Sequence, residues 1–392
     1  MVVDNGGTLE VFGKGSPAIY INGRKVNDLQ ELSQLNSGEI KNVEVITNPG
    51  ASYAADVKSV IRIRTKPPKG DGFSGILRSD NGFQHYFRTG NSLDLKYRTS
   101  GLEIFANYGW WRGNTRFDRL NDMNTTTSKG TYRQFVSTIG KESYNDMTGK
   151  LGFSYMINDL HSIGAYYQNS WNRHNTDGTI PSEIWQDGIL LDLYNSDVHN
   201  QSTAVPRHYA NIYYNGIVGK LNIDFNADYI WYKSRELTFN NELSEMGNDR
   251  EVNTSSINHN RMFAEKLVMT YPLWKGQIEI GEEYTNTRTT NLFSANIPET
   301  PNADNRVDEN NIAVFAELGQ QFGHFMIGAG LRYEHVKFNY YEMGLLRDGQ
   351  SKTYNNIFPS LNIATEVGKV RMGLNYTGKT IRPGYDQLDG AI

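Results

Sequence analysis

Apolar and polar residues alternate over long stretches of this 392-residue chain. In one of them, Leu221, Ile223, Phe225, Ala227, Tyr229 and Trp231 alternate with Asn222, Asp224, Asn226 and Asp228. This period of two is typical of a β-strand with one apolar face. The same pattern recurs in residues 102–110, 312–319 and 325–334. Stretches of about 9–11 residues suffice for a tilted strand to cross membrane hydrocarbon, and terminal aromatic residues favour the membrane interface.

The segments between the strands alternate in length. Short turns are expected at residues 99–101, 158–159, 216–220, 272–276, 320–323 and 367–369. Long polar segments, which we interpret as loops, lie near residues 113–144, 173–205, 234–258, 287–308 and 339–353. Outer-membrane barrels combine short periplasmic turns with long extracellular loops. The pattern predicts an all-β membrane barrel of about 13 antiparallel strands, which is a partial barrel because complete bacterial barrels have an even number.

The first 70 residues predict a small α+β domain ahead of the barrel. Residues 43–47 and 60–65 alternate as half-buried strands, and Asn48-Pro49-Gly50 is a turn signal between them. Further elements are a strand at 8–12, a strand at 17–24 with an Asn22-Gly23 turn, a helix at 27–34 and a linker at 67–72.

Four blocks of this domain resemble the plug domain of TonB-dependent outer-membrane transporters. They are Tyr20-Ile21-Asn22-Gly23-Arg24, Ile40-Lys41-Asn42-Val43-Glu44-Val45-Ile46, Pro49-Gly50-Ala51-Ser52-Tyr53 and Val60-Ile61-Arg62-Ile63-Arg64-Thr65-Lys66. The blocks occur in the order of the family and at compatible spacing. Residues 17–24, 354–363 and 380–388 further resemble a Bacteroidota-type branch of that family.

The resemblance implies two domains. Residues 1–67 would be the C-terminal half of the plug domain, and residues 68–392 the N-terminal part of the transmembrane β-barrel. Barrels of this family have about 22 strands, and the N-terminus shows no signal peptide. We therefore expect a fragment that lacks both ends, and we do not expect an open sheet with unpaired edges to form a working pore by itself.

The implied function is uptake of a scarce large solute, such as a siderophore or an oligosaccharide, across the cell outer membrane. Expected partners are outer-membrane lipid, an unknown extracellular solute, and TonB, which the family contacts through a segment absent here. Alternatives are a non-transporting surface or signalling barrel, a truncated non-functional gene product, and a soluble β protein.

The composition excludes several other classes of protein. The chain has no run of 18 apolar residues, which excludes a helical membrane protein. Aromatic residues make up 12%, which suits the interfacial belts of a barrel. The count of zero cysteines excludes disulfides and thiolate metal sites. A net charge of -4 gives no electrostatic reason to expect nucleic acid.

No motif predicts an enzyme, a cofactor or a metal. Residues 373–380 match the P-loop pattern, but they lie on an alternating strand and Pro383 follows instead of a helix. The eight His residues lack the spacing of a metal site. Glu282 and Glu283 are adjacent on a strand and should point to opposite faces. We predict no catalytic, cofactor-binding or metal-binding residues.

Arg62 and Arg64 share one face of a strand, and two interpretations stay open. The face is either solvated, or it anchors the plug to acidic residues of the barrel wall such as Asp224, Asp228, Glu317 and Glu334. Aromatic and amide residues at 171–175 and 185–187 are compatible with a ligand site and equally with plain interfacial residues. We therefore assign no ligand-binding residue.

Overall fold

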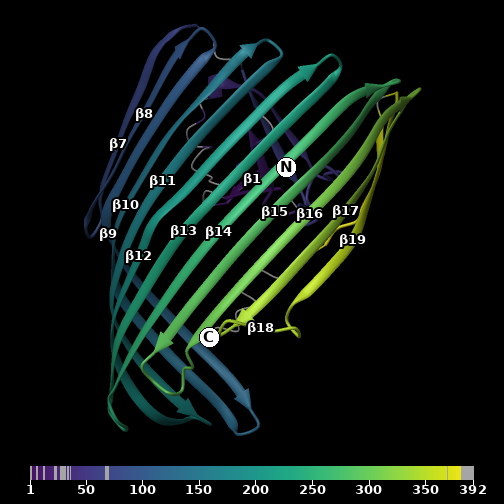
Figure 1. The fold of residues 1–392 in the computed structure, drawn as a ribbon. Coiled ribbons are helices and arrows are strands. Elements are labelled where there is room, and N and C mark those ends of the chain that lie inside the picture. Colours follow the sequence, from purple (N-terminus) through teal and green to yellow (C-terminus); the bar gives the residue numbers. More distant parts are fainter. Residues whose placement is uncertain are drawn as a thin grey trace.

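The computed structural model describes residues 2–5, 8–11, 14–21, 24–26, 32, 35, 37–66, 70–368 and 370–380. These residues form one large antiparallel sheet, one four-stranded sheet and one two-stranded sheet. Figure 1 shows the long, tilted strands of the large sheet side by side. The first two strands, β1 (Val2–Asn5) and β2 (Thr8–Val11), pair only with each other.

The large sheet is built from consecutive antiparallel neighbours. Its strands are β7 (Gly72–Phe83), β8 (Phe87–Thr99), β9 (Leu102–Thr127), β10 (Gly130–Asn158), β11 (His161–Gln186), β12 (Ile189–Val218), β13 (Leu221–Ser244), β14 (Arg250–Leu273), β15 (Gly276–Ala295), β16 (Ala303–Phe322), β17 (Phe325–Glu342), β19 (Lys352–Val367) and β20 (Val370–Thr377). The short β18 (Leu345–Leu346) pairs with β17 beside this path. The path agrees with the predicted count of about 13 strands. Among the described residues, β7 and β20 each pair on one side only, so the sheet is open.

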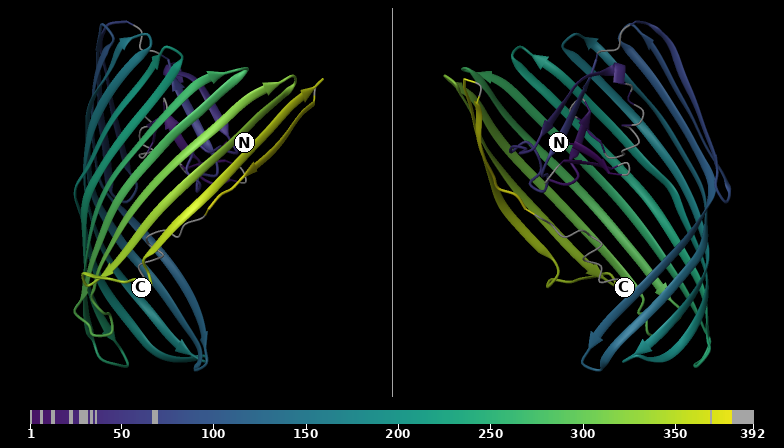
Figure 2. Two further views of the ribbon diagram at one scale, coloured as in Figure 1. Left: turned by 45° about the vertical axis from the view of Figure 1, so that its right-hand side comes forward. Right: turned by 180° about the vertical axis from the view of Figure 1, so that it is seen from behind.

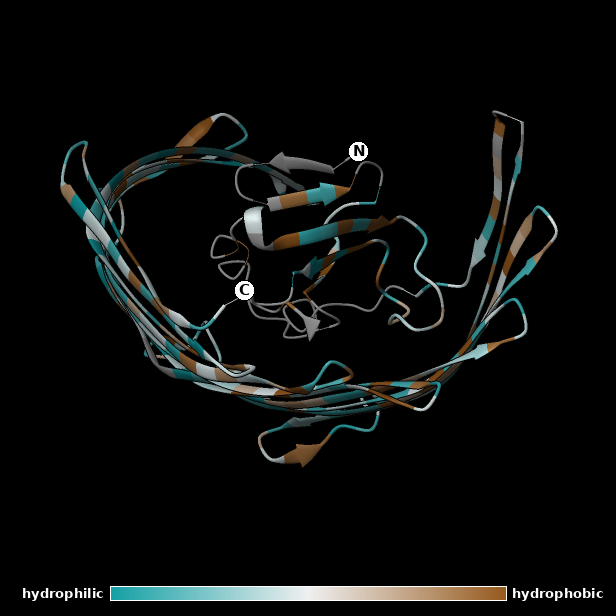
Figure 3. Cartoon of the chain, turned by 90° about the horizontal axis from the view of Figure 1, so that it is seen from above, coloured by the Kyte–Doolittle hydropathy of each residue, from teal (hydrophilic) through white to brown (hydrophobic). Residues whose placement is uncertain are grey.

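The alternation of residues gives the large sheet two different faces. Viewed from above, the sheet curves around the N-terminal segments and forms a wall with a concave and a convex side (Figure 3). On β16 and β17, Val314 and Leu331 face outward and are 49% and 53% exposed. Their neighbours Ala313 and Arg332 face inward and are almost fully buried. The predicted amphipathic strands are confirmed.

The interpretation of the long polar segments as loops is wrong for most of their length, and besides the turns at residues 128–129 and 187–188 only residues 245–249, 296–302 and most of 343–351 lie outside the strands. Residues 113–127 continue β9, and β10 begins at Gly130 after a turn of residues 128–129. In the same way β11 and β12 extend to a turn at Asp187 and Gly188, whose positive φ angles of 50° and 81° suit a tight hairpin. The extensions carry polar residues on both faces, as expected where water covers both sides of a strand, so the regular apolar alternation is lost while the strand continues.

The short turns are close to their predicted places. Ser100 and Gly101 join β8 to β9 with positive φ angles of 46° and 82°. Other turns lie at residues 159–160, 219–220, 274–275 and 323–324, and Gly368 begins the turn between β19 and β20. These turns lie at one end of the wall, and the tips of the long hairpins lie at the other.

The small sheet has the strand order β4-β3-β6-β5. Its strands are β3 (Ala18–Ile21), β4 (Arg24–Lys25), β5 (Ile40–Ile46) and β6 (Val60–Thr65), and the 3-10 turn η1 (Ser37–Glu39) precedes β5. Burial of Ile19, Ile21, Val26, Ile61 and Ile63 forms its core. The predicted strands at 43–47 and 60–65 are confirmed as an antiparallel pair. The predicted helix at 27–34 except residue 32, the Asn22-Gly23 turn and residues 67–69 of the linker lie outside the described residues.

The small sheet lies on the concave side of the large sheet. The views from two sides in Figure 2 and from above in Figure 3 agree on this placement. A 13-residue connection, residues 47–59, joins β5 to β6. We call it the inner loop, and the predicted turn at residues 48–50 is only its beginning.

The predicted lipid cover of the convex face can be tested by one matched pair of substitutions. Leu151 on β10 faces outward and is 61% exposed, whereas Val268 on β14 faces inward and lines a cavity next to the small sheet. Arginine at a lipid-facing position near the bilayer midplane costs about 2–4 kcal/mol. We expect Leu151→Arg to lower the free energy of unfolding in lipid bilayers by this amount, and Val268→Arg to lower it less. Equal losses, measured by denaturant unfolding, would contradict this orientation.

Candidate functional site

The inner loop makes several of its hydrogen bonds with the wall and with the residues that follow β20. The amide of Ala51 donates to Glu317 Oε2 (2.9 Å), and the amide of Ala55 donates to Glu334 Oε1 (3.4 Å). Lys266 Nζ donates to the carbonyl oxygen of Ser52. The amide of Thr380 donates to the carbonyl oxygen of Ala55 (3.2 Å), and Lys379 Nζ donates to that of Pro49 (3.4 Å). A buried loop must satisfy its backbone polar groups, and here side chains of the wall do so.

Small residues bring the loop close to the wall. A Cβ atom at Gly50 would lie 2.2 Å from Glu317 Oε2. A Cβ atom at Gly330 on β17 would lie 2.9 Å from Cβ of Ala51 and 2.6 Å from Ser360 Oγ. Larger residues at either position would push the loop away from its hydrogen-bond partners.

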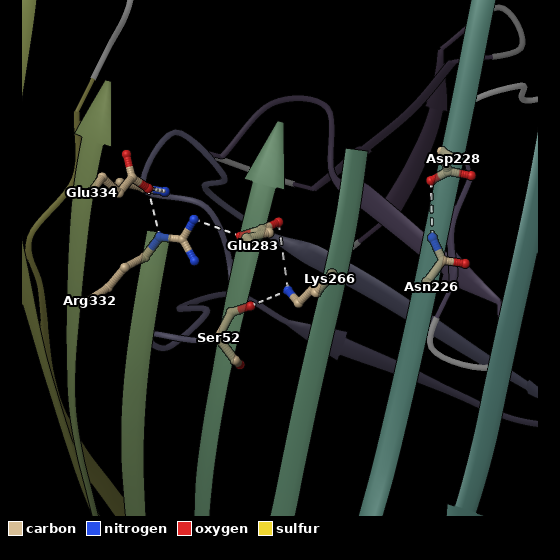
Figure 4. A network of polar contacts seen from close by, with 8 residues as sticks. Ser52, Asn226, Asp228, Lys266, Glu283, Arg332 and Glu334 are labelled. Carbon is tan, nitrogen blue, oxygen red and sulfur yellow. Dashed lines mark hydrogen bonds and ion pairs between the residues drawn. The ribbon is translucent and has the colours of Figure 1, made fainter. Parts of the chain in front are cut away.

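A chain of charges, two of them buried and two partly buried, lies on the wall next to the loop (Figure 4). Lys266 is 3.9 Å from Glu283, Glu283 is 2.6 Å from Arg332, and Arg332 is 2.6 Å from Glu334. Arg332 and Glu334 are 2% and 1% exposed. Removing a single partner from such a buried pair leaves an uncompensated charge, which is strongly destabilising.

The register of three strands explains how this charge chain forms. Glu283 on β15, Ala313 on β16 and Glu334 on β17 are direct cross-strand neighbours. The small side chain of Ala313 leaves room between the two carboxylates. Arg332 fills that room, with its guanidinium carbon 5.8 Å from the centre of the Phe315 ring. One arginine therefore compensates two carboxylates that face the inner loop.

Tyr53 connects the inner loop to the small sheet. Its ring packs edge-on against Tyr20, with centroids 5.5 Å apart. Lys266 Nζ and the guanidinium of Arg62 lie 5.5 Å and 5.6 Å from the ring centre. Burial raises the pKa of Tyr53 to about 12, although the nearby Arg62 guanidinium acts in the opposite direction. The phenol therefore stays neutral at any physiological pH.

A polar cavity of about 550 Å³ separates the small sheet from the wall. The small sheet contributes Lys41, Arg62 and Arg64 to its lining. The wall contributes Asn222, Asp224, Lys266, Gln277 and Glu279. A lining with charges of both signs suits water and polar solutes, whereas most pockets for small organic ligands are largely apolar.

The structure gives Arg62 and Arg64 a different role from direct anchoring. Both line the cavity, and Arg62 Nη1 lies 3.5 Å from Glu44 Oε2 within the small sheet. Within the described ranges, no ion pair joins either arginine to Asp224, Asp228, Glu317 or Glu334. Asp228 instead accepts from Tyr209, Asn211 and Asn226, while Glu317 and Glu334 accept from the inner loop. The inner loop, rather than the arginine face, makes the anchoring contacts.

The other sequence candidates do not converge on one site. Glu283 faces Arg332 and Glu282 faces outward, as their adjacency predicted. Residues 373–377 of the P-loop match belong to β20, paired with β19. Trp171 lies on the outer face, His174 on the inner face between Glu142 and Asp146, and Trp185 donates to Glu183. In the part of the chain that is described, no group of three His, Asp or Glu side chains could hold a metal ion.

Sequence reasoning missed Lys266 and Arg332 as functional residues. A usable signal was present, because Arg332 and Glu334 alternate with Leu331 and Tyr333. Charges on the face opposite an apolar one must point into the barrel. Their partners could not be derived, because pairing depends on the register of β14 to β17.

Comparison with known proteins gives one family and several structures. The model of the outer membrane protein beta-barrel family matches residues 218–390. No curated protein matches the chain. Among the described residues, no helix has the length and hydropathy required to span a membrane.

The similar structures include receptors and a protease. The ferric preacinetobactin receptor of Acinetobacter baumannii is 11% identical, with a TM-score of 0.33 over 94% of this chain and 72% of that chain. The ferric yersiniabactin uptake receptor of Yersinia pestis is 9% identical, with a TM-score of 0.31 over 96% and 80%. The Escherichia coli outer membrane protease OmpT is 13% identical, with a TM-score of 0.23 over 67% and 96%.

The family match and the curved antiparallel sheet confirm the predicted fold class. The match covers β13 to β20, and the remaining wall strands extend the same sheet. The chain has the fold of an outer-membrane β-barrel wall, and its location is the cell outer membrane.

The close contact at Gly330 gives a test of how the loop is held. Gly330→Ala places a methyl group within 2.9 Å of Ala51 Cβ, so the loop must move away from Glu317. Gly328→Ala is the matched control, because its nearest contact would be 3.8 Å, and neither glycine has a positive φ angle. We expect Gly330→Ala to destabilise the docked loop by about 1–3 kcal/mol and to speed amide exchange at Ala51. Equal exchange in the two variants would show that Gly330 does not set the contact.

Proposed function

We propose that this chain is part of a TonB-dependent outer-membrane transporter that takes up a scarce large solute such as a siderophore or an oligosaccharide. The main observation behind the proposal is the small sheet held on the concave side of the wall through the inner loop. A domain in that position occludes the barrel interior. The sequence blocks quoted above favour the same family.

We further propose the domain division at residues 67 and 68. Residues 1–67 act as the C-terminal half of the plug, and residues 68–392 as the N-terminal part of the barrel. The small sheet ends at Thr65 and the first wall strand begins at Gly72, which supports this division.

The polar contacts between the inner loop and the wall support a plug that moves. The loop is held by hydrogen bonds to charged groups of the wall, and each of these groups can be satisfied by water after the loop leaves. A plug that stayed in place permanently would be more stable on an apolar surface, because burial of apolar surface is the dominant stabilising contribution. The polar cavity beside the inner loop already separates the plug from the wall over several residues.

TonB is the proposed energy-coupling partner, and outer-membrane lipid surrounds the wall. A force that TonB exerts on the plug would act on the contacts that residues 49–55 make with the wall. Because the contacts of Ala51, Ser52 and Ala55 with charged side chains lie on β14 to β17, we expect that side of the wall to hold the plug longest.

A reversible covalent lock tests the proposal, since the chain contains no cysteine. Ala51→Cys with Gly330→Cys brings two thiols within reach of a disulfide after a shift of about 1 Å. In cells whose uptake of one labelled solute depends on this protein, we expect the oxidised variant to be inactive and reduction to restore uptake. Uptake should also stop when TonB is deleted.

The two single-cysteine variants are the controls for this lock. They carry the same substitutions without the bond, so oxidation should leave their uptake unchanged. Uptake through the oxidised double variant, or uptake that does not require TonB, would contradict the transport mechanism and favour a surface or signalling barrel.

A further inference from the structure

The outer face of β9, β10 and β11 carries three successive rows of side chains with different chemistry. Residues in one row are direct cross-strand neighbours in the register of the three strands. The tryptophan row is Trp110, Met147 and Trp171; the arginine row is Arg112, Asn145 and Arg173; the amide row is Asn114, Ser143 and Asn175.

These rows face away from the barrel interior. Asp224 lines the inner cavity, and Asp228, four residues along β13, accepts a hydrogen bond from Tyr209. Tyr209 packs on Tyr166, and Lys150 lies 4.2 Å from the ring centre of Tyr166. Lys150 therefore faces inward. The odd-numbered β10 residues of the three rows face outward, because side chains alternate along a strand.

The rows continue an apolar face toward the long hairpins. Nearer the short turns, the same outer face carries Ile104, Leu151 and Phe153, which are 42%, 61% and 39% exposed. The order toward the hairpins is thus aliphatic, then tryptophan, then arginine and amide. Outer-membrane barrels place the apolar band in hydrocarbon and the aromatic belt at the interface. The arginine row therefore lies at the level of the outer-leaflet headgroups.

A cavity of about 720 Å³ lies at the arginine and amide rows. Phe87, Arg112, Asn114, Ser143, Arg173 and Asn175 are among the residues that line it. Arg112 and Arg173 flank Asn145, so their Cα atoms are about 10 Å apart, two strand spacings. Two arginine side chains at this separation can reach a single anion from opposite sides.

Both arginines are available for a ligand. Among the described residues, neither guanidinium takes part in an ion pair or a hydrogen bond. The carboxylates nearby on the same face have other partners: Asp118 pairs with Arg116 (3.3 Å), and Asp177 with His199 (2.6 Å). Trp110 Nε1 donates to Asn145 Oδ1 (2.8 Å), and this hydrogen bond joins a residue of the tryptophan row to one of the arginine row.

We propose that this cavity binds the phosphorylated sugar headgroup of an outer-leaflet glycolipid. Arg112 and Arg173 bind the phosphate, since guanidinium groups form paired hydrogen bonds with phosphate oxygens. Asn114, Ser143 and Asn175 offer hydrogen bonds to sugar hydroxyls, and Trp110 and Trp171 contact the start of the acyl chains. The proposal rests on the outer-membrane location and does not depend on transport.

A binding experiment with lipid A tests this proposal on the purified full protein in detergent micelles. The probes are phosphorylated lipid A, the same lipid after enzymatic removal of its phosphates, and inorganic phosphate, each followed by tryptophan fluorescence. We expect phosphorylated lipid A to bind most tightly. We expect Arg112→Ala and Arg173→Ala each to raise its Kd about tenfold, the effect of losing a charge-assisted hydrogen bond.

Two further variants serve as controls. Arg288→Ala removes an outward arginine that already binds Asp308 (2.6 Å), so its Kd should match that of the unmodified protein. The double variant Arg112→Lys with Arg173→Lys keeps both charges without the paired geometry, so its Kd should lie between those of the unmodified protein and the alanine variants. It also keeps the test valid if an alanine variant fails to fold.

Three results would overturn the proposal. The first is equal binding of phosphorylated and phosphate-free lipid A. The second is an unchanged Kd in the arginine variants. The third is saturation by inorganic phosphate without any binding of lipid A, which would assign the cavity to a free anion.

Discussion

The amide groups of Ala51 and Ala55 lie inside the curved wall and need acceptors, because buried backbone groups without partners are costly. Glu317 and Glu334 provide these acceptors, and the same side of the wall provides Lys266 for the carbonyl oxygen of Ser52. Carboxylates buried in this way need compensating charge. Arg332 supplies it to Glu334 and Glu283 together, in the space left by Ala313. The placement of the small sheet therefore depends on one arginine that belongs to the wall.

This arrangement connects stability with movement. The polar contact between the inner loop and the wall is specific, since each hydrogen-bonding group has one geometry that satisfies it. Hydrogen bonds to water can also replace this contact, since water satisfies the same groups after the loop leaves. The polar cavity beside Tyr53 brings solvent close to the inner loop. On the opposite face, lipid and not water is the neighbour, and the side chains change accordingly from Leu151 through Trp171 to Arg173.

The sequence predicted those parts of the structure that depend on local pattern. The alternation in residues 221–231 and 325–334 predicted strands and their apolar face, and Ser100-Gly101 marked a turn. The extensions beyond the membrane were mistaken for loops, because water on both faces removes the alternation; the Asp187-Gly188 turn was the available signal. The charge chain was not predictable, because Lys266, Glu283 and Arg332 meet only through the register of four strands and the position of the inner loop.

Amide exchange of the inner loop in an Arg332→Met variant shows whether the buried charges hold the loop on the wall. Arg347→Met is the matched control, because Arg347 also pairs with a glutamate, Glu342, but at the surface with 46% exposure. Loss of a buried ion-pair partner costs about 3–5 kcal/mol, so we predict strongly faster exchange at Ala51 and Ala55 with Arg332→Met and no change with Arg347→Met. Unchanged exchange at both amides in Arg332→Met would show that the loop is held by something other than the buried charges.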